Sequence, residues 1–155
     1  MVSTLGPPGV WLKCPHGPFG VDRREPARPA AAADPGRAGC AQAYMKSEMP
    51  SLGVRVPEVR RIVTAAFREL QPGSLEELQA PILELWRGAG WREERYAASD
   101  LTGLRLAAGE PGMLPLYEEI IRSGAWWDLV DGVAHRLCDL MKAYREDMTP
   151  GAAAL

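Results

Sequence analysis

The 155-residue sequence lacks the features that define several classes of protein. Its three cysteines, Cys14, Cys40 and Cys138, are an odd number without Cys-x-x-Cys or zinc-finger spacing, so neither a disulfide framework nor a structural metal site is indicated. No apolar run is long enough to span a bilayer, and the N-terminus lacks a basic region followed by an apolar one. We therefore expect a cytoplasmic protein with reduced thiols and no membrane segment.

A strong excess of charge of either sign is also missing. The net charge of -2 does not indicate a nucleic-acid-binding protein, because a surface that binds nucleic acid is expected to be basic. This counts only mildly against DNA binding, because a local basic surface can coexist with an acidic average. Hydrophobic residues at 46% and charged residues at 25% are ordinary for a globular chain, and the length suits one domain.

Proline and glycine are concentrated at the start of the chain. Half of the 14 prolines and six of the 16 glycines lie in the first 40 residues. This composition breaks helices and strands and supplies no apolar face for packing. We predict an irregular leader over residues 1–32 and a short tail over residues 150–155.

Between these segments the apolar residues recur at helical spacing, and no β pattern of any length competes. Asp34 and Ser74 are the expected N-caps of the first and third helices, and Pro81 should kink or split the third. Short turns with glycine or proline join the helices, which predicts antiparallel pairs stacked side by side in an all-α fold. The helices are predicted over residues 38–45, 57–70, 75–87, 92–108, 113–123 and 125–144.

The last predicted helix carries two stripes of side chains. Its three-and-four spacing predicts a buried stripe of Trp126, Val130, Val133, Leu137, Leu140 and Met141. A second stripe beside it contains Trp127, Asp131, His135 and Cys138, so that one helical turn presents an indole and a carboxylate together. This pair suits a cationic, partly apolar ligand, because the indole face attracts positive charge and the carboxylate stabilises it.

Ordinary structural roles are the alternatives for these residues. Trp86 and Trp126 are predicted to be core residues, and Asp128 to complement the helix dipole. For the carboxylate paired with the indole in the second stripe, the alternative is an ordinary surface carboxylate that is either solvated or satisfied by a partner. His135 is more typical of a packing or surface residue than of a metal ligand, and the charged run at 92–95 is typical of a solvated helix face with local ion pairs.

Three ordered segments resemble one known family. They are YMKSEMP at 44–50 followed by LGV and PEVR, then LWR at 85–87 followed by REERYAA at 92–98, and WWDLVD at 126–131. These segments are similar to motifs of the AlkD-like family of bacterial DNA alkylation repair enzymes, and they occur in the expected order. Ser51 departs from the family pattern, in which an aromatic residue is usual between the preceding proline and the following leucine.

The resemblance implies a HEAT-like α-solenoid over residues 33–149. It also implies a base-excision DNA N-glycosylase that removes cationic N3- and N7-alkylated purines from double-stranded DNA, as a monomer and without metal or organic cofactor. A cationic purine departs as a neutral base, so a carboxylate that stabilises positive charge on the sugar matters more than a strong general acid. By match to the family, Asp131 is the expected catalytic carboxylate. Trp127 is expected to hold the lesion nucleotide and to assist catalysis, and Tyr44 to contact the substrate on the same concave surface.

Members of this family continue for several more helices, which carry a further arginine and a further tryptophan of the active site. Neither has a counterpart in this sequence. We therefore interpret residues 33–149 as the N-terminal part of the family domain and expect little base release from these 155 residues alone. The alternative from another class is a noncatalytic HEAT-like helical-repeat module that binds DNA or protein.

Overall fold

The computed structural model describes residues 32–145, which form six α-helices and, within that range, no β-strand. The predicted all-α class is therefore confirmed for these residues. The predicted leader, apart from its last residue, and the predicted tail lie outside the described range. The helices are α1 (Pro35–Met45), α2 (Val56–Leu70), α3 (Leu75–Arg87), α4 (Arg92–Leu101), α5 (Leu114–Gly124) and α6 (Trp127–Ala143).

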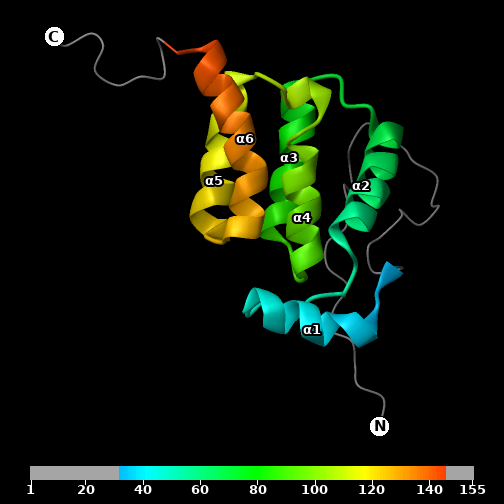
Figure 1. The fold of residues 1–155 in the computed structure, drawn as a ribbon. Helices are drawn as coiled ribbons and strands as arrows, with labels where there is room; N and C mark the ends of the chain where they lie inside the picture. The colour runs from blue at the N-terminus through cyan, green and yellow to red at the C-terminus, as the bar shows by residue number, and fades with distance from the viewer. Residues whose placement is uncertain (1–31, 146–155) are drawn as a thin grey trace, which may run out of the picture.

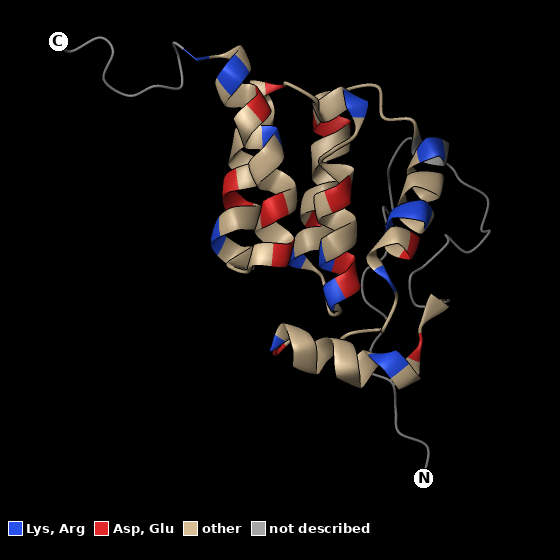
Figure 2. Cartoon of the chain, viewed as in Figure 1, with Lys and Arg blue, Asp and Glu red and all other residues tan. Residues whose placement is uncertain are grey.

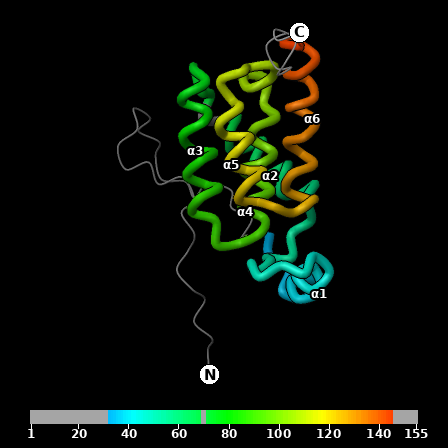
Figure 3. The backbone as a smooth tube through the Cα atoms, turned by 90° about the vertical axis from the view of Figure 1, so that its left-hand side faces the viewer, coloured from blue at the N-terminus to red at the C-terminus, as the bar shows by residue number. Residues whose placement is uncertain are grey.

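The five helices after α1 pack side by side in two layers (Figures 1 and 3). In one layer α4 lies between α2 and α6, and in the other α3 packs on α4 and α5 packs on α6, with α3 also touching α5. Successive helices in this group run in opposite directions, so α2, α4 and α6 all begin at the same end. Helix α1 lies across that end.

Local signals set the first turns of the helices, as the sequence predicts. The Asp34 carboxylate accepts hydrogen bonds from two backbone N–H groups of the first turn of α1, at 3.0 and 3.3 Å. The Ser74 hydroxyl accepts from the Glu77 backbone N–H at 3.2 Å at the start of α3. Both side chains satisfy donors that a helix leaves unpaired at its N-terminus, and both N-cap predictions are confirmed.

The structure corrects predictions about two helix interiors. Of the kink or split predicted at Pro81, the split is wrong, because α3 is one helix from Leu75 to Arg87. The helix predicted over 92–108 ends at Leu101, and two short 3-10 turns, Arg105–Ala107 and Pro111–Met113, lead to α5. The Arg136 side chain of α6 packs directly against Gly103 in the turn that follows α4. A Cβ atom on Gly103 would be only 2.4 Å from the Arg136 Nη2 atom.

The core lies between the two layers and is built from one apolar face of each helix from α2 to α6. Trp86 is buried as predicted, and its indole N–H donates to the Ser123 hydroxyl at 2.8 Å. Each fully buried large apolar side chain contributes about 1.5–3 kcal/mol relative to an exposed one. The principal core residues are Val59, Val63 and Phe67 of α2, Leu78, Ile82, Leu85 and Trp86 of α3, Ala97 and Leu101 of α4, Leu116, Tyr117 and Ile120 of α5, and Leu129, Val133 and Leu140 of α6.

The buried face of α6 differs from the predicted stripe. Val133 and Leu140 are buried as expected, but Leu129 is buried as well, and Met141 is exposed. Trp126 is 39% exposed, so its predicted core position is wrong. The reason is that Trp126 precedes the helix as its N-cap, with extended backbone angles (φ -139°, ψ 140°), and therefore does not follow the helical period.

Helix α1 has no fully buried residue, and it is attached mainly at its ends. At its start, the Asp34 backbone N–H donates to the Leu52 carbonyl oxygen at 2.8 Å. Gly53 has a φ of +77°, and a Cβ atom there would lie 2.3 Å from the Asp34 carbonyl oxygen. Glycine is therefore required for this close approach of the loop to α1.

Candidate functional site

The second stripe of α6 is exposed along its whole length. Trp127 is 57% exposed, and Asp131, His135 and Cys138 are exposed on the turns that follow. The Asp131 carboxylate forms no hydrogen bond or ion pair with the described residues 32–145. The helix therefore presents an indole and an uncommitted carboxylate to solvent one turn apart.

The Asp128 carboxylate, which lies between these two residues in sequence, is instead buried and paired. Its carboxylate is held by the Arg92 guanidinium in a two-point contact, with Nη2 to Oδ1 at 2.6 Å and Nε to Oδ2 at 3.0 Å. The Tyr96 hydroxyl donates a further hydrogen bond to Oδ2 at 2.5 Å. The Arg92 and Asp128 side chains are only 8% and 9% exposed, so this is a buried ion pair between α4 and α6.

Arg92 also reaches the segment that follows α1. Its Nη1 atom donates to the Ser47 hydroxyl at 2.9 Å, and that hydroxyl donates in turn to the Met49 carbonyl oxygen at 3.0 Å. Burial lowers the pKa of Arg92, but its hydrogen bonds to Asp128 and Tyr96 outweigh this and leave the pKa raised. Burial, reinforced by hydrogen bonding to Asp128, also raises the pKa of Tyr96. Both groups therefore keep their protons at neutral pH.

Glu93 occupies a second buried polar site at the start of α4. Its carboxylate accepts hydrogen bonds from the Ser51 hydroxyl at 2.7 Å, the Leu52 N–H at 2.8 Å and the Gly53 N–H at 2.9 Å. The Ser51 hydroxyl also accepts a hydrogen bond from the Gly53 N–H at 3.0 Å. The loop before α2 is thus folded around one carboxylate.

The predicted solvated face at residues 92–95 is therefore wrong for its first three members. Arg92, Glu93 and Glu94 are buried, and Glu94 caps its own helix by accepting from the Gly90 and Trp91 N–H groups. Arg95 is partly exposed, and its guanidinium lies 4.7 Å from the ring centre of a core tryptophan. Apart from Tyr96, which is four residues after Arg92, the partners of the first two are 36 to 45 residues away in sequence, where no local pattern reveals them.

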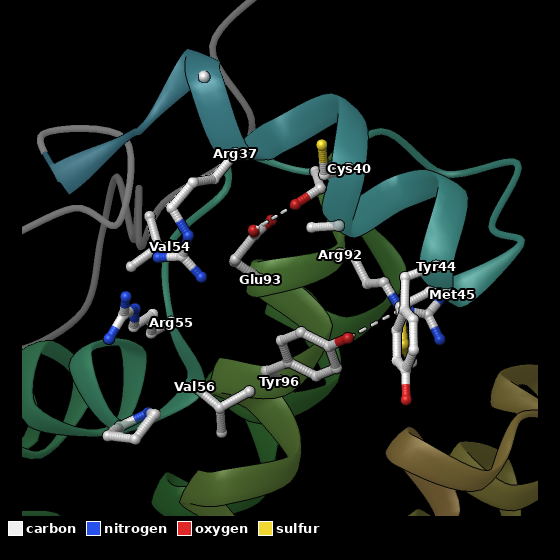
Figure 4. Close-up of a pocket in the computed structure, with 14 residues that line it drawn as sticks. Arg37, Cys40, Tyr44, Met45, Val54, Arg55, Val56, Arg92, Glu93 and Tyr96 are labelled. Carbon is white, nitrogen blue, oxygen red and sulfur yellow. Dashed lines mark hydrogen bonds between the residues drawn. The ribbon is translucent and has the colours of Figure 1, made fainter.

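A pocket of about 570 Å³ lies between α1 and the starts of α2 and α4. Tyr44, which is 79% exposed, lines it together with Arg92 and Tyr96. Figure 4 shows Tyr44 beside Arg92 on one side of the pocket, with Arg37 and Arg55 on the other. The remaining lining is largely apolar. The pocket thus adjoins the ion pair that leads to the first turn of α6.

Figure 2 shows that several Lys and Arg residues lie along α2 and in the segment just before it. Arg60 pairs with Asp100 of α4 at 3.1 Å, and Arg61 pairs with Glu58 within α2. The exposed arginines that form no ion pair within the described part of the chain include Arg37, Arg55 and Arg68. The layer of α2, α4 and α6 therefore combines arginines on α2 with the indole and carboxylate on α6.

Two further properties concern the described residues alone. Among residues 32–145, no group of three or more histidine, cysteine, aspartate or glutamate side chains is arranged to hold a metal ion. No helix in the same range is long and apolar enough to cross a membrane.

Comparison with protein families identifies the chain. It matches the model of the DNA alkylation repair enzyme family over residues 29–151, a range that includes α1 to α6 and both buried polar sites. The chain belongs to this family. The resemblance found from the sequence is thus confirmed. Comparison with curated proteins and with solved structures gives no match.

The sequence placed two of the three candidate residues of this DNA alkylation repair family member on one face. Trp127 and Asp131 are adjacent because they are four residues apart in one helix. Tyr44 lies on α1 and joins that region only through the pocket that it shares with Arg92.

The buried Arg92, Tyr96 and Asp128 network was missed. One local signal was present: Arg92 and Tyr96 are also four residues apart, which predicts a shared face of α4. The assignment of Asp128 to the helix dipole was incomplete, because this carboxylate lies in the first turn but is bound by a side chain of another helix.

Proposed function

We propose that this protein acts in DNA alkylation repair as a DNA N-glycosylase that removes cationic N3- and N7-alkylated purines from double-stranded DNA. Membership of the family supports the repair role. The observation that carries the chemistry is the exposed, unpaired carboxylate of Asp131 one turn from the exposed indole of Trp127. Unlike the Asp128 carboxylate, which is bound by Arg92 and Tyr96, the Asp131 carboxylate is available to a ligand.

In this proposal Asp131 stabilises positive charge that develops on the sugar as the glycosidic bond breaks, and it orients the attacking water. Trp127 holds the cationic base or its sugar against the face of the indole. Tyr44 contacts the nucleotide from α1. The departing base needs no strong general acid, since loss of the glycosidic bond neutralises it.

The proposed domain is a HEAT-like α-solenoid over residues 33–149, with a leader over 1–32 and a tail over 150–155. The alternation of helices between two layers supports the solenoid, because α2, α4 and α6 form one layer and α3 and α5 the other. In this arrangement the layer of α2, α4 and α6 is the DNA-binding face. The unpaired arginines Arg37, Arg55 and Arg68 are candidates for contacts with DNA phosphates.

The test is release of base from a duplex that contains one 7-methylguanine, measured with protein in excess over DNA and over incubations long enough to quantify the slow release that is expected from these 155 residues alone. Asp131→Asn should slow release roughly 100-fold, because the charge acts mainly in the transition state. DNA affinity should change by no more than about threefold. Asp139→Asn is the matched control, since it removes another exposed carboxylate of the same helix and should leave the rate unchanged.

Substitutions of two residues near Asp131 make the test more specific. Trp127→Ala should weaken both binding and release, because the indole both positions the nucleotide and stabilises charge. His135→Ala should do little, although His135 is exposed on the same stripe. Full activity of Asp131→Asn would remove the catalytic assignment. DNA binding without base release by the parent protein would favour the noncatalytic helical module.

A further inference from the structure

Three segments of the chain meet at one buried group of side chains, which we call the Asp128 clamp and define as Ser47, Arg92, Tyr96 and Asp128. Asp128 is in the first turn of α6, Arg92 and Tyr96 are on α4, and Ser47 follows α1. The Arg92 guanidinium donates to both other segments at once, to Asp128 at 2.6 and 3.0 Å and to Ser47 at 2.9 Å.

The clamp lies between the residues that form the proposed site. Asp128 is adjacent to Trp127 in sequence and three residues before Asp131, so any movement of its backbone carries both along. On the other side, the clamped segment begins three residues after Tyr44. We propose that the Asp128 clamp positions Tyr44 relative to Trp127 and Asp131, and so sets the geometry of the lesion-binding site. The identity of that site rests on the proposed function.

The geometry of the clamp suits positioning better than neutralisation of charge alone. A guanidinium is planar and holds a carboxylate through two parallel hydrogen bonds, which fixes orientation as well as distance. Tyr96 adds a third donor to the same carboxylate, at 2.5 Å. Because α1 has no fully buried residue, contacts such as the Ser47 hydrogen bond determine where its C-terminal end lies.

The clamp also leaves only one of two neighbouring carboxylates available to a ligand. Asp128 is buried and bound to a cation of the protein, whereas Asp131 is exposed and unpaired. A cationic base at this turn of α6 therefore meets one available carboxylate. The clamp residues act through Trp127, Tyr44 and Asp131, and they are positioning residues with no contact to the substrate in this proposal.

The chain carries its own labelling sites for a direct test. Cys40 on α1 and Cys138 on α6 are both exposed, and Cys14→Ser leaves them as the two remaining thiols. Spin labels on both allow the distance distribution between α1 and α6 to be measured by pulsed electron paramagnetic resonance. We expect Asp128→Asn and Arg92→Met to broaden and shift this distribution relative to the parent.

A matched control is available on the far side of the bundle. Arg87 of α3 and Glu119 of α5 form another two-point pair between helices, at 2.6 Å for both contacts, but this pair is more exposed than Arg92–Asp128 and involves no residue of α1 or of the segment after it. Glu119→Gln should leave the distance distribution unchanged. A broadening equal to that of Asp128→Asn would overturn the proposal, because it would show a general loosening and no specific role of the clamp.

Ser47→Ala separates positioning from stability. It leaves the Arg92–Asp128 ion pair intact and removes the hydroxyl that binds Arg92 and Met49, so the unfolding midpoint should fall less than in Asp128→Asn, which breaks the buried ion pair itself. We expect a broader distribution in this variant as well. A parent-like distribution in Ser47→Ala overturns the proposal, and this variant decides the question even where Asp128→Asn fails to fold.

The activity measurement uses a conservative substitution. Arg92→Lys keeps the positive charge but not the planar fork, so base release at saturating protein should fall roughly 10- to 100-fold while DNA affinity stays within a few fold. Full activity of Arg92→Lys overturns the proposal. Absence of base release by the parent protein counts against the proposed glycosylase function alone, because the distance measurements do not depend on activity.

Discussion

The carboxylate of Glu93 provides the sharpest test of how the first helix is attached to the rest of the protein. It is almost fully buried, and it accepts three hydrogen bonds from the loop that precedes α2. Two of the donors are backbone N–H groups, those of Leu52 and Gly53. Substitution by glutamine keeps the shape of the side chain and changes only its charge and one acceptor.

The expected loss of stability in Glu93→Gln follows from these contacts. If the amide oxygen keeps the Oε1 position, it retains the bonds from Ser51 and Gly53, but the amide NH₂ then faces the Leu52 N–H. A buried donor left without an acceptor costs about 1–3 kcal/mol, and the two retained bonds lose the strengthening that the charge provided. We expect the free energy of unfolding to fall by about 2–4 kcal/mol, a large part of a total of about 5–15 kcal/mol.

The measurement is guanidinium unfolding followed by far-ultraviolet circular dichroism. A lower midpoint at an unchanged slope would report a loss of stability without a change in the unfolding transition. Glu84→Gln is the matched control, because Glu84 is exposed on α3, and it should change stability by no more than about 0.5 kcal/mol. Equal midpoints for Glu93→Gln and Glu84→Gln would show that the loop does not depend on the buried carboxylate.

Two further predictions concern stability. Burial and the hydrogen bond to Asp128 raise the pKa of Tyr96 in the folded protein, so its contribution is complete below about pH 10, the unfolded value, and is lost as the pH rises toward the folded pKa. Alkaline titration of the unfolding free energy should therefore be flatter for Tyr96→Phe than for the parent, and parallel curves would contradict this. Gly53 and Gly109 share positive φ values of 77° and 76°, but only Gly53 has backbone atoms where a Cβ would lie. Thermal unfolding should show that Gly53→Ala costs at least about 2 kcal/mol more than Gly109→Ala, and equal costs would argue against the close contact with α1.

Much of the helical framework was predictable because its signals are local. The period of apolar residues and the proline in the first turn located α2, and the side-chain caps Asp34 and Ser74 located the starts of α1 and α3. The end of α4 was not predictable in this way. The turn that follows α4 packs at Gly103 against the Arg136 side chain of α6, and this contact between distant segments has no local sequence signal.

In the candidate site, too, the features set by local signals were predictable and those set by distant contacts were not. Trp127 and Asp131 are neighbours in any helix that contains both, because residues four apart lie on one face. Trp126 was misplaced for a related reason: the position of the first helical residue decides whether the periodic pattern applies to it. Prediction of helix starts is least secure at such boundaries.

The sequence by itself determined the helices and the pairing of an indole with a carboxylate at the start of α6, because both follow from interactions within one turn or two of the chain. Only the tertiary structure decided which of the two carboxylates remains available. Asp128 and Asp131 are alike in sequence context, but the guanidinium that neutralises Asp128 comes from α4, 36 residues earlier. That contact exists because α4 and α6 pack against each other, and such packing depends on the whole core.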